Sequence, residues 1–238
     1  MISENINIVR DKIQRRCLDS NRNPEEIRLV AVSKNTGIDS ICGALRAGIL
    51  DLGENKAQEL NEKIPLIEQE LPEIKVNWHF LGHLQTNKVK YVVPKAYLIH
   101  SVDSIRLAEE INSQAVKLGK VQKILLEVNT SEEASKYGLK DEEELLRLAE
   151  ECRKLPAVEL LGLMTMAPFT DEESLVRKSF SKLRNLKLMM NEKGFNLSEL
   201  SMGMTHDYEI AIEEGATMLR IGTAIFGERD YSKSWREQ

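Results

Sequence analysis

Short apolar runs alternate along the chain with stretches whose apolar residues recur at helical spacing. Residues 3–20 are predicted to form a helix. Its apolar positions are Ile6, Val9, Ile13 and Cys17. Residues 28–33 follow as a continuous β-rich run, which is typical of a strand buried on both faces. A second helix is predicted over 39–47 and ends at Gly48.

The same strand–helix unit then recurs along the chain. The other predicted strands cover residues 49–53, 76–82, 96–101, 122–128, 158–164, 197–202 and 217–221. The helices between them include 55–70 and a long one over 172–193. Eight strands alternating with helices are typical of a barrel, whereas a doubly wound open sheet rarely needs eight consecutive units. We therefore expect an α/β fold, a single (β/α)8 TIM barrel with an extra N-terminal helix, formed by residues 1–238 as one domain.

Composition narrows the classes of function. Net charge is −5 and no long basic run is present, which argues against a nucleic-acid partner. No apolar run approaches the ~20 residues of a membrane span, and no signal peptide is visible, so we expect a cytoplasmic protein without a membrane partner. Three scattered cysteines fit a reducing compartment. The four histidines lack metal-ligand spacing, so we expect no metal.

Lys34 is the sharpest candidate for chemistry. In a (β/α)8 barrel the working face lies at the carboxyl ends of the strands, and Lys34 directly follows the first strand. A partly desolvated lysine amine suits Schiff-base chemistry. The alternative is a lysine whose ammonium group simply reaches solvent at a strand end.

The ends of the seventh and eighth predicted strands suggest a phosphate site. Ser201 and Gly203 end one strand, and Gly222 and Thr223 end the other. Backbone N–H groups freed by glycine, with hydroxyls beside them, suit a phosphate, although ordinary strand-to-helix turns would look similar. Arg220 lies inside the eighth strand, where it either faces a ligand ring or forms a salt bridge in the barrel wall. A phosphate anchor opposite a reactive lysine would suit pyridoxal 5′-phosphate.

Two further residues lie at predicted strand ends. Asn55 follows the second strand, where helix capping explains it nearly as well as ligand contact. Met164 ends the sixth strand, where it either packs against a cofactor or fills the core.

Motifs spread over nearly the whole chain are similar to those of one protein family. The main ones are Leu29-Val-Ala-Val-Ser-Lys34, Gly53-Glu-Asn55, Trp78-His-Phe-Leu-Gly82, Ser201-Met-Gly-Met204 and Arg220-Ile-Gly-Thr223. With these motifs the chain resembles the pyridoxal phosphate homeostasis proteins. The resemblance implies a fold-type III barrel like the N-terminal domain of alanine racemase. One departure is Thr205-His206, where many relatives have Ser followed by a small or acidic residue; Thr keeps the hydroxyl.

The resemblance also implies roles for individual residues. Lys34 would form the aldimine with pyridoxal 5′-phosphate. The phosphate ligands would be Ser201, Gly203, Gly222 and Thr223. Arg220 would lie near the pyridine nitrogen, and Asn55 and Met164 would line the pocket.

The function implied is vitamin B6 homeostasis, with indirect effects on amino-acid balance. We expect a non-catalytic monomer whose partners are pyridoxal 5′-phosphate and PLP-dependent apoenzymes. An arginine at the pyridine nitrogen is a poor proton donor, because its ordinary pKa exceeds ~12. Racemases of this fold also carry an additional β domain, whereas few residues follow Asp230 here. The alternatives are a low-activity amino-acid racemase that uses Lys34, and a barrel enzyme acting on a phosphorylated sugar.

Overall fold

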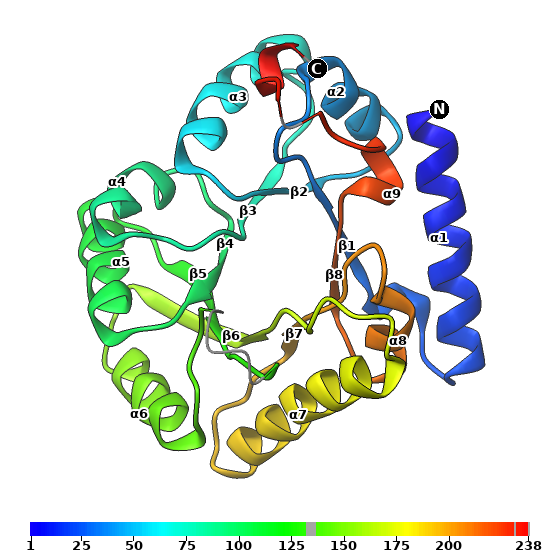
Figure 1. Cartoon of the computed structure of the whole chain (residues 1–238). Helices are drawn as coiled ribbons and strands as arrows, with labels where there is room; N and C mark the ends of the chain where they lie inside the picture. Colours follow the sequence, from blue (N-terminus) through cyan, green and yellow to red (C-terminus); the bar gives the residue numbers. More distant parts are fainter. Residues whose placement is uncertain (132–136, 231, 238) are drawn as a thin grey trace.

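Eight parallel strands close into a barrel in the computed structural model, which describes residues 1–131, 137–230 and 232–237 (Figure 1). Each strand pairs with the next, and β8 pairs with β1 through Ala31 and Ile221. The strands are β1 Arg28–Val32, β2 Asp51–Glu54, β3 Asn77–Phe80, β4 Leu98–Val102, β5 Gln122–Glu127, β6 Val158–Met164, β7 Glu199–Ser201 and β8 Met218–Ile221. The predicted barrel is confirmed, with strands somewhat shorter than expected.

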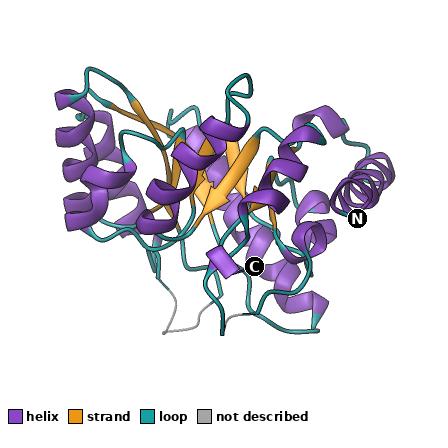
Figure 2. Cartoon of the chain, turned by 90° about the horizontal axis from the view of Figure 1, so that it is seen from above, coloured by secondary structure: helices purple, strands orange, loops and turns teal. Residues whose placement is uncertain are grey.

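Helices surround the barrel on the outside (Figures 1 and 2). They are α1 Ile2–Asp19, α2 Ile38–Arg46, α3 Ala57–Glu70, α4 Val89–Val92, α5 Ile105–Lys117, α6 Glu142–Arg153, α7 Glu173–Glu192, α8 Tyr208–Glu213 and α9 Thr223–Phe226. Three 3₁₀ turns are η1 Pro24–Glu26, η2 Thr86–Lys88 and η3 Trp235–Glu237. The extra N-terminal helix is confirmed as α1, which packs against α8 and α9. None of the described helices has the length and apolar character needed to cross a bilayer.

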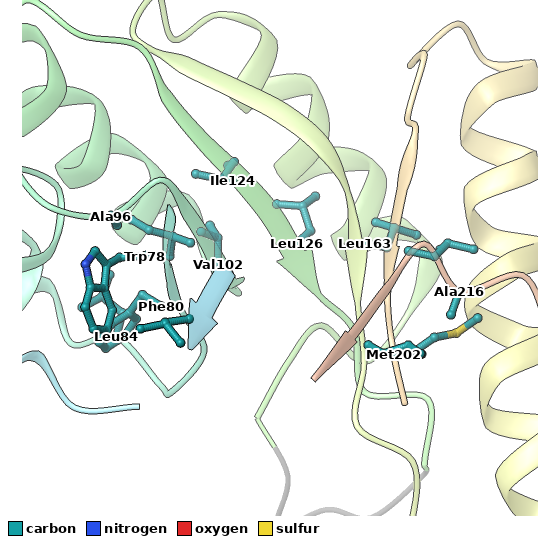
Figure 3. Packing of buried hydrophobic residues seen from close by; sticks show 14 of the residues in the cluster. Trp78, Phe80, Leu84, Ala96, Val102, Ile124, Leu126, Leu163, Met202 and Ala216 are labelled. Carbon is teal, nitrogen blue, oxygen red and sulfur yellow. The ribbon is translucent and has the colours of Figure 1, made fainter. Parts of the chain in front are cut away.

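The apolar core has two layers, because successive side chains of a strand point to opposite faces of the sheet. The outer layer lies between strands and helices, where Trp78, Leu126 and Leu163 are buried (Figure 3). The inner layer fills the barrel with Leu98, Leu125, Met164 and Met218. Full burial of such a side chain contributes about 1.5–3 kcal/mol. The barrel is therefore a packed core and not an open channel.

The C-terminal segment returns to the barrel and packs beside α3 (Figure 1). Trp235 is only 6% exposed, and its ring lies 5.4 Å from Nζ of Lys63 on α3. Arg236 forms an ion pair with Glu62 at 2.8 Å. These contacts place the segment near the end of β1.

Candidate functional site

The carboxyl ends of β1 and β8 lie next to each other. Val30 pairs with Arg220, so Lys34 and Gly222 follow two neighbouring strands. Arg229 joins these ends, since its Nη2 donates a hydrogen bond to the Val32 carbonyl at 2.6 Å. The same Nη2 would lie 2.5 Å from a Cβ added to Gly222, so the guanidinium group rests directly on this glycine. The predicted lysine and the predicted phosphate turn are therefore on adjacent strands.

Gly203 brings the loop after β7 against the end of β8. Its carbonyl accepts a hydrogen bond from the Arg220 N–H at 2.9 Å. Its φ of +94° is in the left-handed region, and an added Cβ would lie 2.6 Å from Cβ of Ala211. Ala224 also donates its N–H to the Thr205 hydroxyl at 3.3 Å. Glycine is favoured at Gly203 for two reasons: its backbone is left-handed, and there is no room for a Cβ atom.

Arg220 is held inside the barrel by neutral partners. Its Nη1 donates to the Ser201 hydroxyl at 2.7 Å, and its Nη2 donates to the Thr165 carbonyl at 2.8 Å. No carboxylate among the described residues lies within ion-pair distance of the guanidinium. Burial lowers the pKa of Arg220 to about 10, so the side chain remains a cation at neutral pH. The alternative of a barrel-wall salt bridge is not observed in the part of the chain that is described.

A buried hydrogen-bond chain runs from Arg220 across the barrel. The Ser201 hydroxyl lies 2.8 Å from Nδ1 of His100, and Nε2 of His100 lies 2.8 Å from Nδ1 of His79. Nε2 of His79 lies 2.9 Å from a carboxylate oxygen of Asp51. Burial lowers the pKa of both histidines, which favours neutral rings. With Asp51 as an acceptor, one set of tautomers satisfies the whole chain: each group donates towards Asp51, starting at Arg220.

This hydrogen-bond chain gives Ser201 a structural role in addition to its predicted contact with a phosphate. The side chain is fully buried, and its hydroxyl is bonded to Arg220 and His100. The contact of Ser201 with a phosphate stays a prediction. Met164 likewise exposes only 1% and belongs to the inner apolar cluster, as the core-filling interpretation expects. Its place beside a cofactor also stays a prediction.

Lys34 and Asn55 line one cleft of about 470 Å³, which Trp235 and Arg236 border on another side. Lys34 is half-buried, and its ammonium group has no hydrogen-bond or ion-pair partner within residues 1–131, 137–230 and 232–237. The Oδ1 atom of Asn55 is buried and also lacks a partner among those residues. A buried amide oxygen without a partner is costly, so both groups are suited to a ligand that supplies one. Gly203, Gly222 and Thr223 do not line this cleft.

Two buried charged residues near the strand ends escaped the sequence analysis. Glu127 is the last residue of β5. It lies two residues after Leu125, so both side chains point into the barrel. Burial, with the nearby charge of Asp103, raises the pKa of Glu127 to about 7. Lys63 on α3 is fully buried behind the end of β1. A visible signal for Lys63 was its helical spacing with Leu60, Ile64 and Ile67, which places a lysine on the buried face.

Comparison with known proteins identifies the family. The family model "Alanine racemase, N-terminal domain" matches residues 5–230. A curated relative, the pyridoxal phosphate homeostasis protein of Aquifex aeolicus, is 42% identical over 96% of this chain and 98% of its own. The chain belongs to the pyridoxal phosphate homeostasis protein family.

Solved structures support the same family and its fold. PipY of Synechococcus elongatus, solved with PLP bound, has 33% identity and a TM-score of 0.82, covering 95% of this chain and 100% of PipY. Alanine racemase of Clostridium difficile has 17% identity and a TM-score of 0.74, covering 99% of this chain and 62% of the enzyme. The second likeness concerns the barrel alone. No group of three or more metal-ligating side chains is found among the residues that the structure describes.

Proposed function

We propose that this protein binds pyridoxal 5′-phosphate and serves vitamin B6 homeostasis, with covalent attachment of the cofactor at Lys34. The observation that carries the proposal is the Lys34 amine, which has no partner among the described residues. Lys34 follows β1, and β1 pairs with β8, the strand that Gly222 follows. The family relatives are named for pyridoxal phosphate homeostasis, and PipY was solved with PLP. Both findings support the assignment of the ligand.

The residues proposed to bind the cofactor lie at or near the carboxyl ends of the strands. The residues are Lys34 for the aldehyde carbon, Ser201, Gly203, Gly222 and Thr223 for the phosphate, Arg220 for the ring nitrogen, and Asn55 and Met164 as lining residues. Two features of the structure fit this group. The Asn55 amide oxygen is buried without a described partner, and Arg220 is a cation held by neutral groups.

The cofactor, when bound, supplies an aldehyde and an electron-withdrawing ring. Arg220 keeps its proton at neutral pH, because even its lowered pKa is about 10. It would therefore donate a hydrogen bond to the ring nitrogen without transferring a proton, which weakens the ring as an electron sink. This supports a protein that holds and delivers the cofactor without turning over a substrate. We propose a cytoplasmic monomer whose recipients are PLP-dependent apoenzymes.

A low-activity amino-acid racemase is the second candidate, and Glu127 is the observation that favours it. Racemisation needs an acid or base on each face of the substrate carbon. Lys34 would supply one group. Glu127, with a pKa of about 7, titrates in the range where a general base is effective. Its charge also acts on buried Arg220, which places the carboxyl group in the same part of the barrel.

Exchange of the α-proton of L-alanine in deuterated water separates the two functions. For the holding function we expect the cofactor-loaded protein to show no exchange at ordinary enzyme rates, on the order of 1–10³ s⁻¹. The same loaded protein is then mixed with a PLP-dependent apoenzyme, whose recovered activity reports transfer. Enzyme-like exchange that forms D-alanine and is lost in Glu127→Gln would instead favour the racemase.

A further inference from the structure

Two side chains of α3 form hydrogen bonds with the backbone on either side of Lys34. Nζ of Lys63 donates a hydrogen bond to the Ser33 carbonyl at 2.7 Å. The Glu59 carboxylate accepts a hydrogen bond from the Asn35 N–H at 2.8 Å. Ser33 and Asn35 are the two neighbours of Lys34, so its backbone is fixed from one helix.

Lys63 and Glu59 belong to one buried charge cluster. Nζ of Lys63 lies 2.8 Å from Oε1 of Glu54 and 2.9 Å from Oε2 of Glu59. Oε1 of Glu54 also accepts a hydrogen bond from the Ser33 hydroxyl at 2.7 Å. The side chains of Lys63 and Glu54 have no exposed surface. Burial of such charges costs several kcal/mol per ion unless the geometry is favourable, and apolar residues of similar volume often serve stability as well.

The opposite side of the turn is held by the C-terminal segment. Asn35 has a φ of +50°, and its side-chain amide donates to the Asp230 carbonyl at 3.3 Å. The Trp235 ring covers Nζ of Lys63 at 5.4 Å. The turn is thus enclosed between α3 and the chain end, while the Lys34 amine itself stays without a described partner.

We propose that Lys63 is a positioning residue for Lys34. With Glu59 and Glu54 it fixes the Ser33–Asn35 backbone, so that the Lys34 amine projects at a set angle towards an incoming aldehyde. The inference rests on the proposed attachment of the cofactor at Lys34. A cluster that served only the packing of α3 would affect stability and leave the reactivity of Lys34 unchanged.

The first test replaces Lys63 by methionine and compares it with Ile67→Ala. Ile67 is a buried residue of the same helix, so its truncation lowers stability without removing a side-chain hydrogen bond. Both proteins are assayed at a temperature where circular dichroism shows them folded. We expect Lys63→Met to weaken covalent binding of PLP about tenfold or more, since misplaced reacting groups are costly. Ile67→Ala should bind like wild type.

A second pair of variants covers the case in which Lys63→Met does not fold. Glu59→Met leaves Lys63 paired with Glu54. It removes the acceptor for the Asn35 N–H together with the ion pairs of Glu59 with Lys63 and Lys56. Glu59→Gln keeps an acceptor oxygen at that position. We expect Glu59→Met to lose covalent binding of PLP and Glu59→Gln to restore most of it.

Two readouts are independent of the cofactor. In the cofactor-free protein, the rate of Lys34 acylation by a small reagent is followed by peptide mass spectrometry, and exchange of the Asn35 amide by hydrogen–deuterium exchange. We expect Lys63→Met and Glu59→Met to change the acylation rate and to raise Asn35 exchange about tenfold or more. If wild type never links PLP, the proposed function fails, and these readouts still decide the role of Lys63. If wild type and both methionine variants link PLP equally, the role of Lys63 alone is overturned.

Discussion

Nη1 of Arg220 lies 2.7 Å from the hydroxyl oxygen of Ser201, which joins a cation on β8 to β7 inside the barrel. The hydroxyl in turn meets His100, so the orientation of the guanidinium depends on a chain of neutral groups. Neutral partners leave the positive charge of Arg220 available to a ligand. A carboxylate partner would have neutralised it.

Replacement of Ser201 by alanine tests this chain. The variant leaves Nδ1 of His100 and Nη1 of Arg220 without their hydroxyl partner in a buried site. We expect a loss of about 1–3 kcal/mol in the free energy of unfolding, measured by urea denaturation. The matched control is Ser198→Ala at an exposed position, which should change stability by less than about 0.5 kcal/mol. Equal stability of the two variants would show that the hydrogen-bond chain contributes nothing to the free energy of unfolding.

Replacement of Gly203 by alanine tests the close approach of the two loops. The new methyl group would have to fit a φ of +94° and a position 2.6 Å from Cβ of Ala211. We expect a loss of about 3–5 kcal/mol from left-handed strain and overpacking together. Gly119→Ala, with a φ of +61° and nothing within 4 Å, isolates the conformational part and should cost about 1–2 kcal/mol. Similar losses in thermal unfolding for both variants would contradict the packing argument.

The pH dependence of stability reports on Glu127. Its ordinary pKa of 4.5 is raised to about 7 in the folded protein. The folded state therefore binds more protons between these values, and the stabilisation present below pH 4.5 is lost as the pH rises to about 7. We expect this loss to be on the order of 3 kcal/mol in wild type and absent in Glu127→Gln. Exposed Glu109→Gln should keep the wild-type slope in urea unfolding at pH 5, 6, 7 and 8. A wild-type slope in Glu127→Gln would disprove the raised pKa.

The barrel was predictable because apolar periodicity and strand-end glycines are local signals. The short helix α9 was not predicted, since four residues are too few to show a period. Lys34 was found by a positional rule, namely that barrel chemistry lies at the carboxyl ends of strands. Its family role came from the motifs.

The hydrogen-bond chain inside the barrel could not be predicted from the sequence. His79 and His100 lie on adjacent strands, and their contact depends on the register between β3 and β4. No local pattern encodes that register. Lys63 is a different case, because its place on the apolar face of α3 was visible and was overlooked.

Covalent binding at Lys34 is the central claim, and absorbance measures it most directly. Purified wild-type protein mixed with pyridoxal 5′-phosphate should turn yellow and keep the colour after gel filtration. Lys34→Ala should lose the band, while Lys56→Ala, a lysine of the same cleft whose side chain is 75% exposed, should keep it. Mass spectrometry after borohydride reduction should find the added mass on the peptide that contains Lys34. A colourless wild type, or a Lys34→Ala variant as yellow as wild type, would contradict the account.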